Sequence, residues 1–240
     1  MQIRGLTQFS LLDFPGHIAC VVFCGGCNFR CPYCQNPYLV LYPETQPLIV
    51  EEEFFDFLNR RRGKLDGVVI SGGEPTTRPP LLDFTERIKA MGFLVRLDTN
   101  GSRPDIIEIC CRRHLIDSLG IDYKGPAARY NDIALAAVDD LADKVRRTIN
   151  LAREYDIDLD IRTTIHRALL SPEDMKQMRR ELDDMGVGTW YLQQFHRVEI
   201  IDESLLEEPT YTDDELTAIA AEMDRSEEHT SELQSLSHIS

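Results

Sequence analysis

The sequence predicts an α/β fold, a partial (β/α)6 barrel of the TIM type with parallel strands. After residue 18, short β-branched runs alternate six times with amphipathic stretches. Strand–helix units in that order form parallel strands joined by right-handed crossovers. A complete eight-unit barrel takes about 250 residues, whereas the chain has 240 residues. A partial barrel therefore fits the length better than a closed one.

The six expected strands are continuous or alternating apolar runs. They cover 18–23, 67–71, 93–98, 118–122, 159–164 and 189–193. Six helices are expected between and after them, at 51–61, 80–91, 105–113, 139–155, 172–185 and 213–223. The helix ends carry the expected chemistry, with N-cap residues at Ser171 and Thr212 and glycines just past two helices at Gly92 and Gly186.

Composition indicates a globular chain with one sizeable core, since 42% of the residues are hydrophobic and 28% are charged. The net charge of -15 argues against nucleic-acid binding, which needs clustered Lys and Arg. No apolar run is long enough to span a membrane, and the first residues do not resemble a signal peptide. We therefore expect a cytoplasmic protein with a protein or small-molecule partner.

One domain is expected over residues 1–224. The segment 225–240 (RSEEHTSELQSLSHIS) changes abruptly to Ser and Glu without an apolar period, as disordered segments do. It also resembles the in-frame translation of a sequencing adapter. We therefore expect a non-native, disordered tail that takes no part in the fold.

Three cysteines follow the first expected strand at spacings that suit neither a disulfide nor a closed zinc site. Cys27, Cys31 and Cys34 form a CxxxCxxC loop, whereas a disulfide takes two thiols and a structural zinc ion four ligands. Three thiolates can hold three irons of a 4Fe-4S cluster and leave the fourth iron open for chemistry. Cys20 and Cys24 could complete a four-thiolate site, although their position favours buried free thiols.

Two further loops at the carboxyl ends of expected strands carry polar groups, and barrels of this type place their reactive groups there. The first, 71–75 (SGGEP), has two glycines that let the backbone approach a ligand and hydrogen-bond its amine. The second, 98–101 (DTNG), offers a carboxylate, a hydroxyl and an amide. Each loop alone is also a common turn signal.

The combination of CxxxCxxC, with Tyr33 before its last cysteine, and GGEP at the next strand end resembles the radical S-adenosylmethionine (SAM) superfamily over the whole native chain. The resemblance implies that Cys27, Cys31 and Cys34 hold a 4Fe-4S cluster whose open iron binds SAM. One electron from the cluster then cleaves SAM to methionine and a 5′-deoxyadenosyl radical. The chain would be an oxidoreductase.

Within that superfamily, the segments LDTNGS, IDYKGP and WYLQQF and the residues around the cysteines resemble the activating proteins of anaerobic ribonucleoside-triphosphate reductase. They are similar also to pyruvate formate-lyase activating enzymes. The resemblance implies a protein substrate, anaerobic ribonucleotide reductase or another glycyl-radical enzyme. It further implies an electron donor of the flavodoxin or ferredoxin type.

The same resemblance assigns residues to the cofactor site, and Tyr33 of the cysteine loop is one of them. Gly72, Gly73 and Glu74 would face the methionyl amine, and Asp98 and Thr99 would help to hold SAM, with a monovalent cation as a further candidate. A second group matches polar positions of the SAM pocket: Lys124, Arg162 and His196. The alternatives for these three are a solvated loop, an ion pair with a nearby acid, and a rim histidine with its hydrogen bonds satisfied.

Two other functions stay open at this stage. One is a small-molecule radical enzyme, such as the compact deazaguanine-forming synthases of the same superfamily. The other is an iron–sulfur or zinc module that senses redox state and does not consume SAM. A bare partial barrel leaves its side open, so that a large substrate can insert a loop, which favours a protein substrate.

Overall fold

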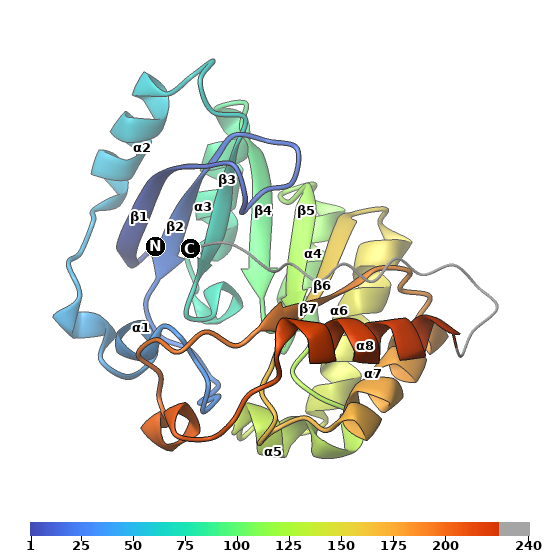
Figure 1. The fold of residues 1–240 in the computed structure, drawn as a ribbon. Helices are drawn as coiled ribbons and strands as arrows, with labels where there is room; N and C mark the ends of the chain where they lie inside the picture. Colours follow the sequence, from blue (N-terminus) through green and yellow to red (C-terminus); the bar gives the residue numbers. More distant parts are fainter. Residues whose placement is uncertain (226–240) are drawn as a thin grey trace.

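The chain folds around one seven-stranded sheet with the spatial order β1 to β7 (Figure 1). The computed structural model describes residues 1–225, so residues 226–240 of the expected tail lie outside the described residues. The strands are β1 Ile3–Ser10, β2 Ala19–Cys24, β3 Gly67–Gly72, β4 Leu94–Thr99, β5 Ser118–Asp122, β6 Asp158–Ile165 and β7 Trp190–Gln194. Strands β2 to β7 pair in parallel, which confirms the predicted α/β fold.

One strand is present that the sequence pattern did not predict. β1 pairs antiparallel with β2, from Ile3 opposite Cys24 to Ser10 opposite Ala19. It is an edge strand, and between its two buried ends its side chains are half-buried or exposed. A strand with a single neighbour needs little apolar content, which is why neither a continuous nor an alternating apolar run marks it.

All six expected helices are present, with ends that differ by a few residues. The helices are α1 Pro37–Leu41, α2 Glu51–Arg60, α3 Leu81–Ala90, α4 Pro104–Arg112, α5 Tyr130–Ala134, α6 Leu141–Glu154, α7 Pro172–Asp184 and α8 Asp213–Arg225. Short 3-10 helices lie at Pro43–Thr45, Pro75–Thr77, Ala127–Arg129 and Glu203–Leu206. Helices α1 and α5 were not predicted because a single turn shows no periodicity. None of the helices in residues 1–225 is long and apolar enough to cross a membrane.

The predicted N-cap residues of α7 and α8 are confirmed. Ser171 Oγ accepts a hydrogen bond from the backbone N–H of Asp174, and Asp174 Oδ2 accepts from the backbone N–H of Ser171 at 2.9 Å. Thr212 and Glu215 make the same reciprocal pair at the start of α8. These pairs satisfy backbone donors that a helix leaves free at its first turn.

The two faces of the sheet are filled differently. One face packs against helices, and Figure 1 shows α3, α4 and α6 behind the sheet, whereas α8 crosses in front beside α7. Along β4, Val95 and Leu97 are buried in that large core, so the alternate residues Arg96 and Asp98 point to the other face. The inner face therefore carries charged groups at β4, while a small apolar cluster around Phe14 and Val69 fills it at β2 and β3.

Trp190, the single tryptophan of the chain, gives a probe of this fold. It is fully buried, and its Nε1–H donates to Thr163 Oγ1 at 2.8 Å while Thr163 donates to the carbonyl of Tyr123 at 2.6 Å. We expect Thr163→Val to lower the free energy of unfolding by about 1–3 kcal/mol, because it leaves a buried N–H without an acceptor. Urea unfolding followed by Trp190 fluorescence measures this. Thr217→Val, at an exposed position of α8, is the control, and an equal loss there would contradict the explanation.

Candidate active site

A cavity of about 360 Å³ lies where the parallel strands end. Its walls come from the loops that follow β2, β3 and β4 and from the ends of β5, β6 and β7. Every predicted site residue except His196 lines it: Cys27, Cys31, Tyr33, Cys34, Gly72, Gly73, Glu74, Asp98, Thr99, Lys124 and Arg162. Predicted site residues as far apart in the sequence as Cys27 and Arg162 thus meet in one place.

His196 lies outside this cavity, in the segment after β7, with an exposed side chain. Its backbone carbonyl accepts a hydrogen bond from the side chain of Gln35 at 3.5 Å. Further along the same segment, the N–H of Asp202 donates to the carbonyl of Pro32 at 2.9 Å. The segment after β7 therefore holds the cysteine loop through its backbone, and the role predicted for the His196 side chain stays a prediction.

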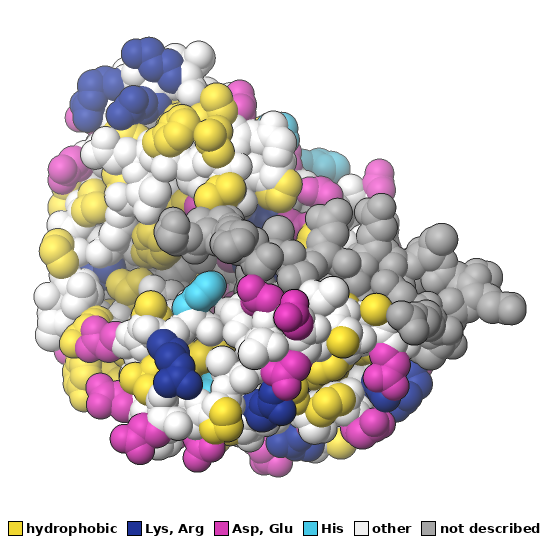
Figure 2. All heavy atoms as spheres, viewed as in Figure 1, with side chains coloured by type: hydrophobic (Ala, Val, Ile, Leu, Met, Phe, Trp, Pro, Cys, Tyr) yellow, Lys and Arg dark blue, Asp and Glu magenta, His cyan; other side chains and the backbone are white. Residues whose placement is uncertain are grey.

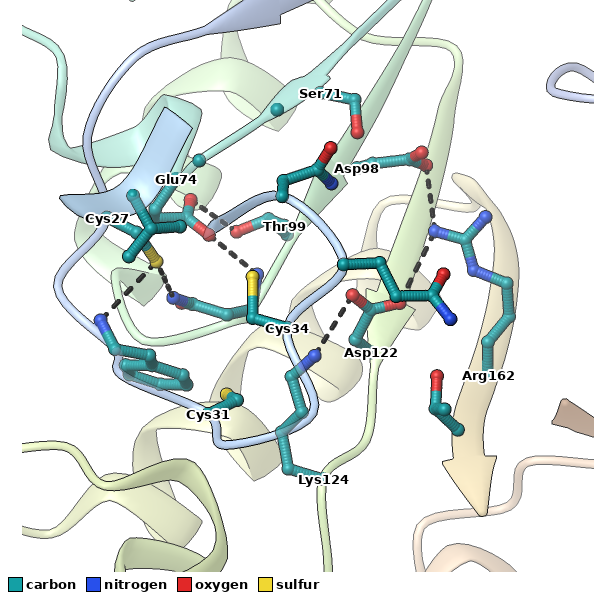
Figure 3. Close-up of a pocket in the computed structure, with 18 of the residues that line it drawn as sticks. Cys27, Cys31, Cys34, Ser71, Glu74, Asp98, Thr99, Asp122, Lys124 and Arg162 are labelled. Carbon is teal, nitrogen blue, oxygen red and sulfur yellow. Dashed lines mark hydrogen bonds and ion pairs between the residues drawn. The ribbon is translucent and has the colours of Figure 1, made fainter. Parts of the chain in front are cut away.

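The three predicted cluster ligands lie on one loop and on one side of the cavity (Figure 3). Cys31 is buried, Cys27 and Cys34 are half-buried, and all three are free thiols. Burial raises the pKa of the Cys27 thiol to about 12 and raises the pKa of Cys31 and Cys34. The thiols are therefore protonated near neutral pH, and a bound metal would replace their protons.

The thiols suit an iron–sulfur cluster better than a single metal ion. Within residues 1–225, no three His, Cys, Asp or Glu side chains surround one position where a metal ion could sit. A tetrahedral zinc site needs its ligands around one ion, whereas each cysteine of a 4Fe-4S cluster binds a different iron. Two donors face the Cys27 sulfur, the N–H of Phe29 at 3.4 Å and Asn100 Nδ2 at 3.9 Å.

The rest of the barrel fixes the cysteine loop. The N–H of Arg30 donates to the carbonyl of Ala134, at the end of α5, at 3.2 Å. The side chain of Asn28 accepts from Asn100 Nδ2 at 2.9 Å and donates to Ser102 Oγ at 3.0 Å. The loop after β4 and the helix after β5 therefore both set the position of the thiols.

The two glycines of SGGEP bring a second loop against the cysteine loop. Gly72 has φ +109, and a Cβ there would lie 2.5 Å from the backbone N of Cys24. At Gly73 a Cβ would overlap the carbonyl of Gly26. Two short hydrogen bonds join the loops, Gly73 N–H to the Cys24 carbonyl and Glu74 N–H to the Gly26 carbonyl, both at 2.8 Å. The glycines therefore let the backbone of one loop approach the backbone of the other. Their contact with the amine of the methionyl group stays a prediction.

The Glu74 carboxylate joins the loops after β3 and β4. It is 1% exposed and accepts hydrogen bonds from Thr76 N–H at 2.9 Å, Thr76 Oγ1 at 2.5 Å, Thr99 Oγ1 at 2.8 Å and Asn100 N–H at 2.7 Å. Burial raises the pKa of Glu74, and the hydrogen bonds oppose that rise. Four donors satisfy a carboxylate that has lost its water, so Glu74 connects DTNG to the cysteine loop.

Charged groups at the end of β5, just after it and on β6 form the adjoining wall, and Lys124 lies close to the cysteine loop (Figure 3). Lys124 Nζ lies 3.1 Å from Asp122 Oδ2 and 5.6 Å from the centre of the Tyr33 ring. Arg162 Nη2 lies 3.3 Å from Asp98 Oδ1 and 3.5 Å from Asp122 Oδ1. The Lys124 side chain is 14% exposed, so it is not in a solvated loop, whereas the ion pairs expected as the alternative for Arg162 are present.

These groups keep their charges. Burial alone would lower the pKa of Lys124, but Asp122 and neighbouring groups raise it well above its usual range. Burial likewise opposes ionisation of Asp122, yet Lys124 and Arg162 lower its pKa. The Tyr33 hydroxyl is buried and has no hydrogen-bond partner among the described residues. The wall therefore offers fixed cations and a carboxylate to a polar ligand.

The structure adds residues that the sequence reasoning missed. Asp122 ends β5, so the rule that reactive groups follow parallel strands could have found it. Asp13 also lines the cavity, from the loop that connects β1 and β2. That loop precedes β2 and so does not follow the carboxyl end of a parallel strand. The rule that reactive groups follow parallel strands therefore could not have predicted Asp13.

Comparisons with known proteins identify a family for this chain. The model of the family described as the radical SAM superfamily matches residues 21–186. A Methanocaldococcus jannaschii protein provisionally named glycyl-radical enzyme activating enzyme is 31% identical over 219 residues, which cover 89% of this chain and 88% of that protein.

Two further relatives match over shorter stretches. The pyruvate formate-lyase-activating enzyme of Clostridium pasteurianum is 35% identical over 107 residues, 42% of this chain and 43% of that protein. The 7-carboxy-7-deazaguanine synthase of Hyperthermus butylicus is 39% identical over 92 residues, 38% of each chain. In both cases the alignment spans less than half of the relative.

Two solved structures share the fold. Streptococcus suis SuiB matches with a TM-score of 0.66 and 11% identity over 90% of this chain and 48% of that chain. The structure of anSMEcpe with bound AdoMet matches with a TM-score of 0.56 and 17% identity over 72% of this chain and 48% of that chain. The chain thus spans about half the length of these two proteins.

The contact between the two loops can be tested at Gly73. We expect Gly73→Ala to push the cysteine loop out of place, because the new Cβ would overlap backbone that cannot move aside, and to destabilise the protein by about 1–3 kcal/mol. Iron bound per chain after anaerobic reconstitution should fall. Gly188→Ala is the control, since a Cβ there has no atom within 4 Å. Equal iron loading in the two variants would contradict the interpretation.

Proposed function

The chain belongs to the radical SAM superfamily, and on that basis we propose that it is a glycyl-radical activating enzyme of anaerobic ribonucleoside-triphosphate reductase. The observation that carries the activating-enzyme part of the proposal is the alignment with the Methanocaldococcus jannaschii relative, which extends over nearly the full length of both chains. The reductase as partner rests on the resemblance of the segments LDTNGS, IDYKGP and WYLQQF. The meeting of the three thiols, the Gly72–Gly73 backbone and the cation-lined wall in one cavity supports it. Membership of the superfamily implies SAM and an iron–sulfur cluster as cofactors.

In this proposal Cys27, Cys31 and Cys34 hold the cluster. When bound, the cluster supplies the electron that cleaves SAM into methionine and a 5′-deoxyadenosyl radical. Lys124 places a fixed positive charge beside the thiols, which offsets the negative charge of three thiolates. A flavodoxin- or ferredoxin-type protein is the proposed electron donor.

The remaining wall groups bind and orient SAM. The guanidinium of Arg162 and the ammonium of Lys124 suit the carboxylate of the methionyl group, since charge-assisted hydrogen bonds are the strong ones. The carboxylates of Asp98 and Asp122 suit its positively charged groups. Glu74 holds the loops after β3 and β4 in place.

Hydrogen transfer completes the reaction. The 5′-deoxyadenosyl radical takes one hydrogen atom from a glycine Cα of the partner. The products are 5′-deoxyadenosine and a radical on that glycine. Cleavage of SAM would take one electron from the donor protein. The hydrogen transfer then needs no further electron, because one radical is exchanged for another.

The open sheet favours a partner of protein size. β1 and β7 are the two edges of the sheet in the described residues, so the strands do not enclose the inner face on all sides. Figure 2 shows Asp and Glu side chains spread over the lower part of one face, interspersed there with Lys and Arg, and a further group of Lys and Arg at the top near the end of α2. An acidic surface suits a partner with basic groups around the inserted loop. The seven free cysteines accord with the proposed cytoplasmic location.

A small-molecule reaction is the second candidate. The local identity with a 7-carboxy-7-deazaguanine synthase favours it, but that alignment covers 38% of each chain. Dependence on magnesium and turnover without a protein partner would distinguish it from an activating enzyme.

The first test of the proposed function is anaerobic. The chain ending at Asp224 is reconstituted with iron and sulfide and mixed with dithionite and SAM, and 5′-deoxyadenosine is quantified. We expect the unaltered chain to form 5′-deoxyadenosine and the Cys31→Ala variant to form none. Cys110→Ala is the matched control, because Cys110 is equally buried but lies in α4 away from the cavity. A fully loaded cluster that yields no product would exclude the radical mechanism.

The second test concerns the partner. Anaerobic ribonucleoside-triphosphate reductase is added to the active mixture, and the electron paramagnetic resonance spectrum is recorded. We expect a glycyl-radical signal on the reductase that depends on both SAM and Cys31. Product without any such signal, together with magnesium-dependent conversion of a small substrate, would support the second candidate instead.

A further inference from the structure

The side-chain amide of Asn100, in the DTNG loop after β4, has no role in the proposed reaction as described so far. Asn100 is 6% exposed, and its Nδ2 lies 3.9 Å from the sulfur of Cys27, one of the three proposed cluster ligands. Figure 3 marks two contacts at the Cys27 sulfur, this one and the one from the backbone N–H of Phe29. A buried amide next to a proposed metal ligand can change the chemistry of the bound metal.

The orientation of this amide is fixed, so that a donor and not an acceptor faces the sulfur. Asn100 Oδ1 accepts a hydrogen bond from the backbone N–H of Ser102 at 3.0 Å. If the amide were turned over, its NH₂ group would face that N–H, and two donors would meet. The NH₂ group has two hydrogens, and Asn28 Oδ1 accepts one of them at 2.9 Å. The second hydrogen is left for Cys27.

The surrounding groups hold Asn100 against the cysteine loop. Its backbone N–H donates to Glu74 Oε2 at 2.7 Å. Asn28 Nδ2 donates to Ser102 Oγ at 3.0 Å, which closes a ring of hydrogen bonds between Asn100, Asn28 and Ser102. Because the ring forms within the chain, the donor is in place before any cluster binds.

Negative charge on the Cys27 sulfur is disfavoured by most of its surroundings. Burial raises the pKa of the Cys27 thiol and the nearby Glu74 carboxylate raises it further, whereas the backbone N–H of Phe29 lowers it. Asn100 gives its backbone N–H to Glu74 and a side-chain N–H to Cys27. Hydrogen bonds to charged groups in a buried place are among the strong ones, so Asn100 stabilises two anions that repel each other.

A hydrogen bond to a cluster ligand matters most when the cluster is reduced. Reduction adds one electron, and the negative charge on the cluster and its sulfur ligands increases. Hydrogen bonds to the sulfurs are among the factors that set the reduction potential of an iron–sulfur cluster. A donor stabilises the form with more negative charge, and it therefore raises the potential.

We infer that the Asn100 amide donates a hydrogen bond to the Cys27 thiolate of the bound cluster and thereby raises the reduction potential of that cluster. The proposed donor protein then reduces the cluster more readily. Asn100 acts through Cys27, so it is a positioning residue and not a catalytic one. The inference deepens the proposed function and rests on it, because it takes Cys27 as a cluster ligand.

The midpoint potential of the cluster tests the inference directly. The reconstituted enzyme is titrated anaerobically without SAM, and the reduced cluster is quantified by electron paramagnetic resonance. At the same solution potential, we expect Asn100→Leu to have a ratio of reduced to oxidised cluster about tenfold lower than the unaltered chain, a fall of about 59 mV for one electron. Leucine is close to asparagine in shape but has no side-chain donor, and the backbone N–H to Glu74 remains. An unchanged midpoint potential would overturn the inference.

Ser102→Ala is the matched control. It removes the hydroxyl that accepts from Asn28 and so disturbs the same buried ring, since Ser102 is 2% exposed. It keeps the backbone N–H that orients the Asn100 amide. We expect the midpoint potential of Ser102→Ala to match that of the unaltered chain. An equal fall in both variants would assign the effect to a displaced loop and contradict the inference.

A second measurement needs no variant. The chain is produced with asparagine that carries nitrogen-15 only in its side-chain amide, and the reduced cluster is examined by pulsed electron paramagnetic resonance. We expect a nitrogen-15 coupling in the unaltered chain and in Ser102→Ala, and its loss in Asn100→Leu. If Asn100→Leu does not fold, the absence of this coupling in the unaltered chain would still overturn the inference.

Failure of the inference differs from failure of the proposed function. An enzyme that forms 5′-deoxyadenosine, and whose midpoint potential is the same in Asn100→Leu, would overturn the inference and leave the function intact. The expected shift and coupling in an enzyme that forms no 5′-deoxyadenosine would support the role of Asn100 and remove the function. A chain that binds no cluster would overturn both.

Discussion

The backbone contact between the loops after β2 and β3 is the constraint on which the rest of the site depends. Gly72 and Gly73 let the second loop lie against Cys24 and Gly26 with no side chain between them. The buried Glu74 carboxylate then extends the contact to the loop after β4, because it accepts hydrogen bonds from Thr99 Oγ1 and the N–H of Asn100, in addition to two from Thr76. The thiols are thereby held by three neighbouring strand ends, although they belong to one loop.

Ion pairs between charged side chains are the second feature that orders the inner face of the sheet. At β2 and β3 a small apolar cluster fills the interior, whereas at β4, β5 and β6 ion pairs fill it, arranged around Gly120. Buried ion pairs contribute little net stability, because desolvation offsets their attraction. They do fix direction, and here they hold Arg162 and Asp122 at the cavity wall beside the cysteine loop.

The loop contact and the ion pairs have different roles in the proposed reaction. The glycine contact and Glu74 position the thiols, and the ion pairs position the polar wall that would receive SAM. The open edges of the sheet at β1 and β7 leave room for a loop of a larger partner. Because the cluster and SAM supply the reactive electron and radical, the chain itself needs only to bind, orient and exclude water.

From the sequence alone, the six parallel strands, the six longer helices, the cysteine loop and two of the strand-end loops could be predicted. These follow from periodicity, spacing and the rule that reactive groups lie where parallel strands end, as Cys27 and Glu74 illustrate, whereas Lys124 and Arg162 came from the family resemblance. Only the tertiary structure decided the edge strand β1, the entry of Asp13 into the cavity, the place of His196 outside it and the pairing of Arg96 with Asp98 and Asp160. The physical reason is register, because the alignment of neighbouring strands decides which side chains face each other across a sheet. The sequence pattern of one strand does not show how its neighbours are aligned with it.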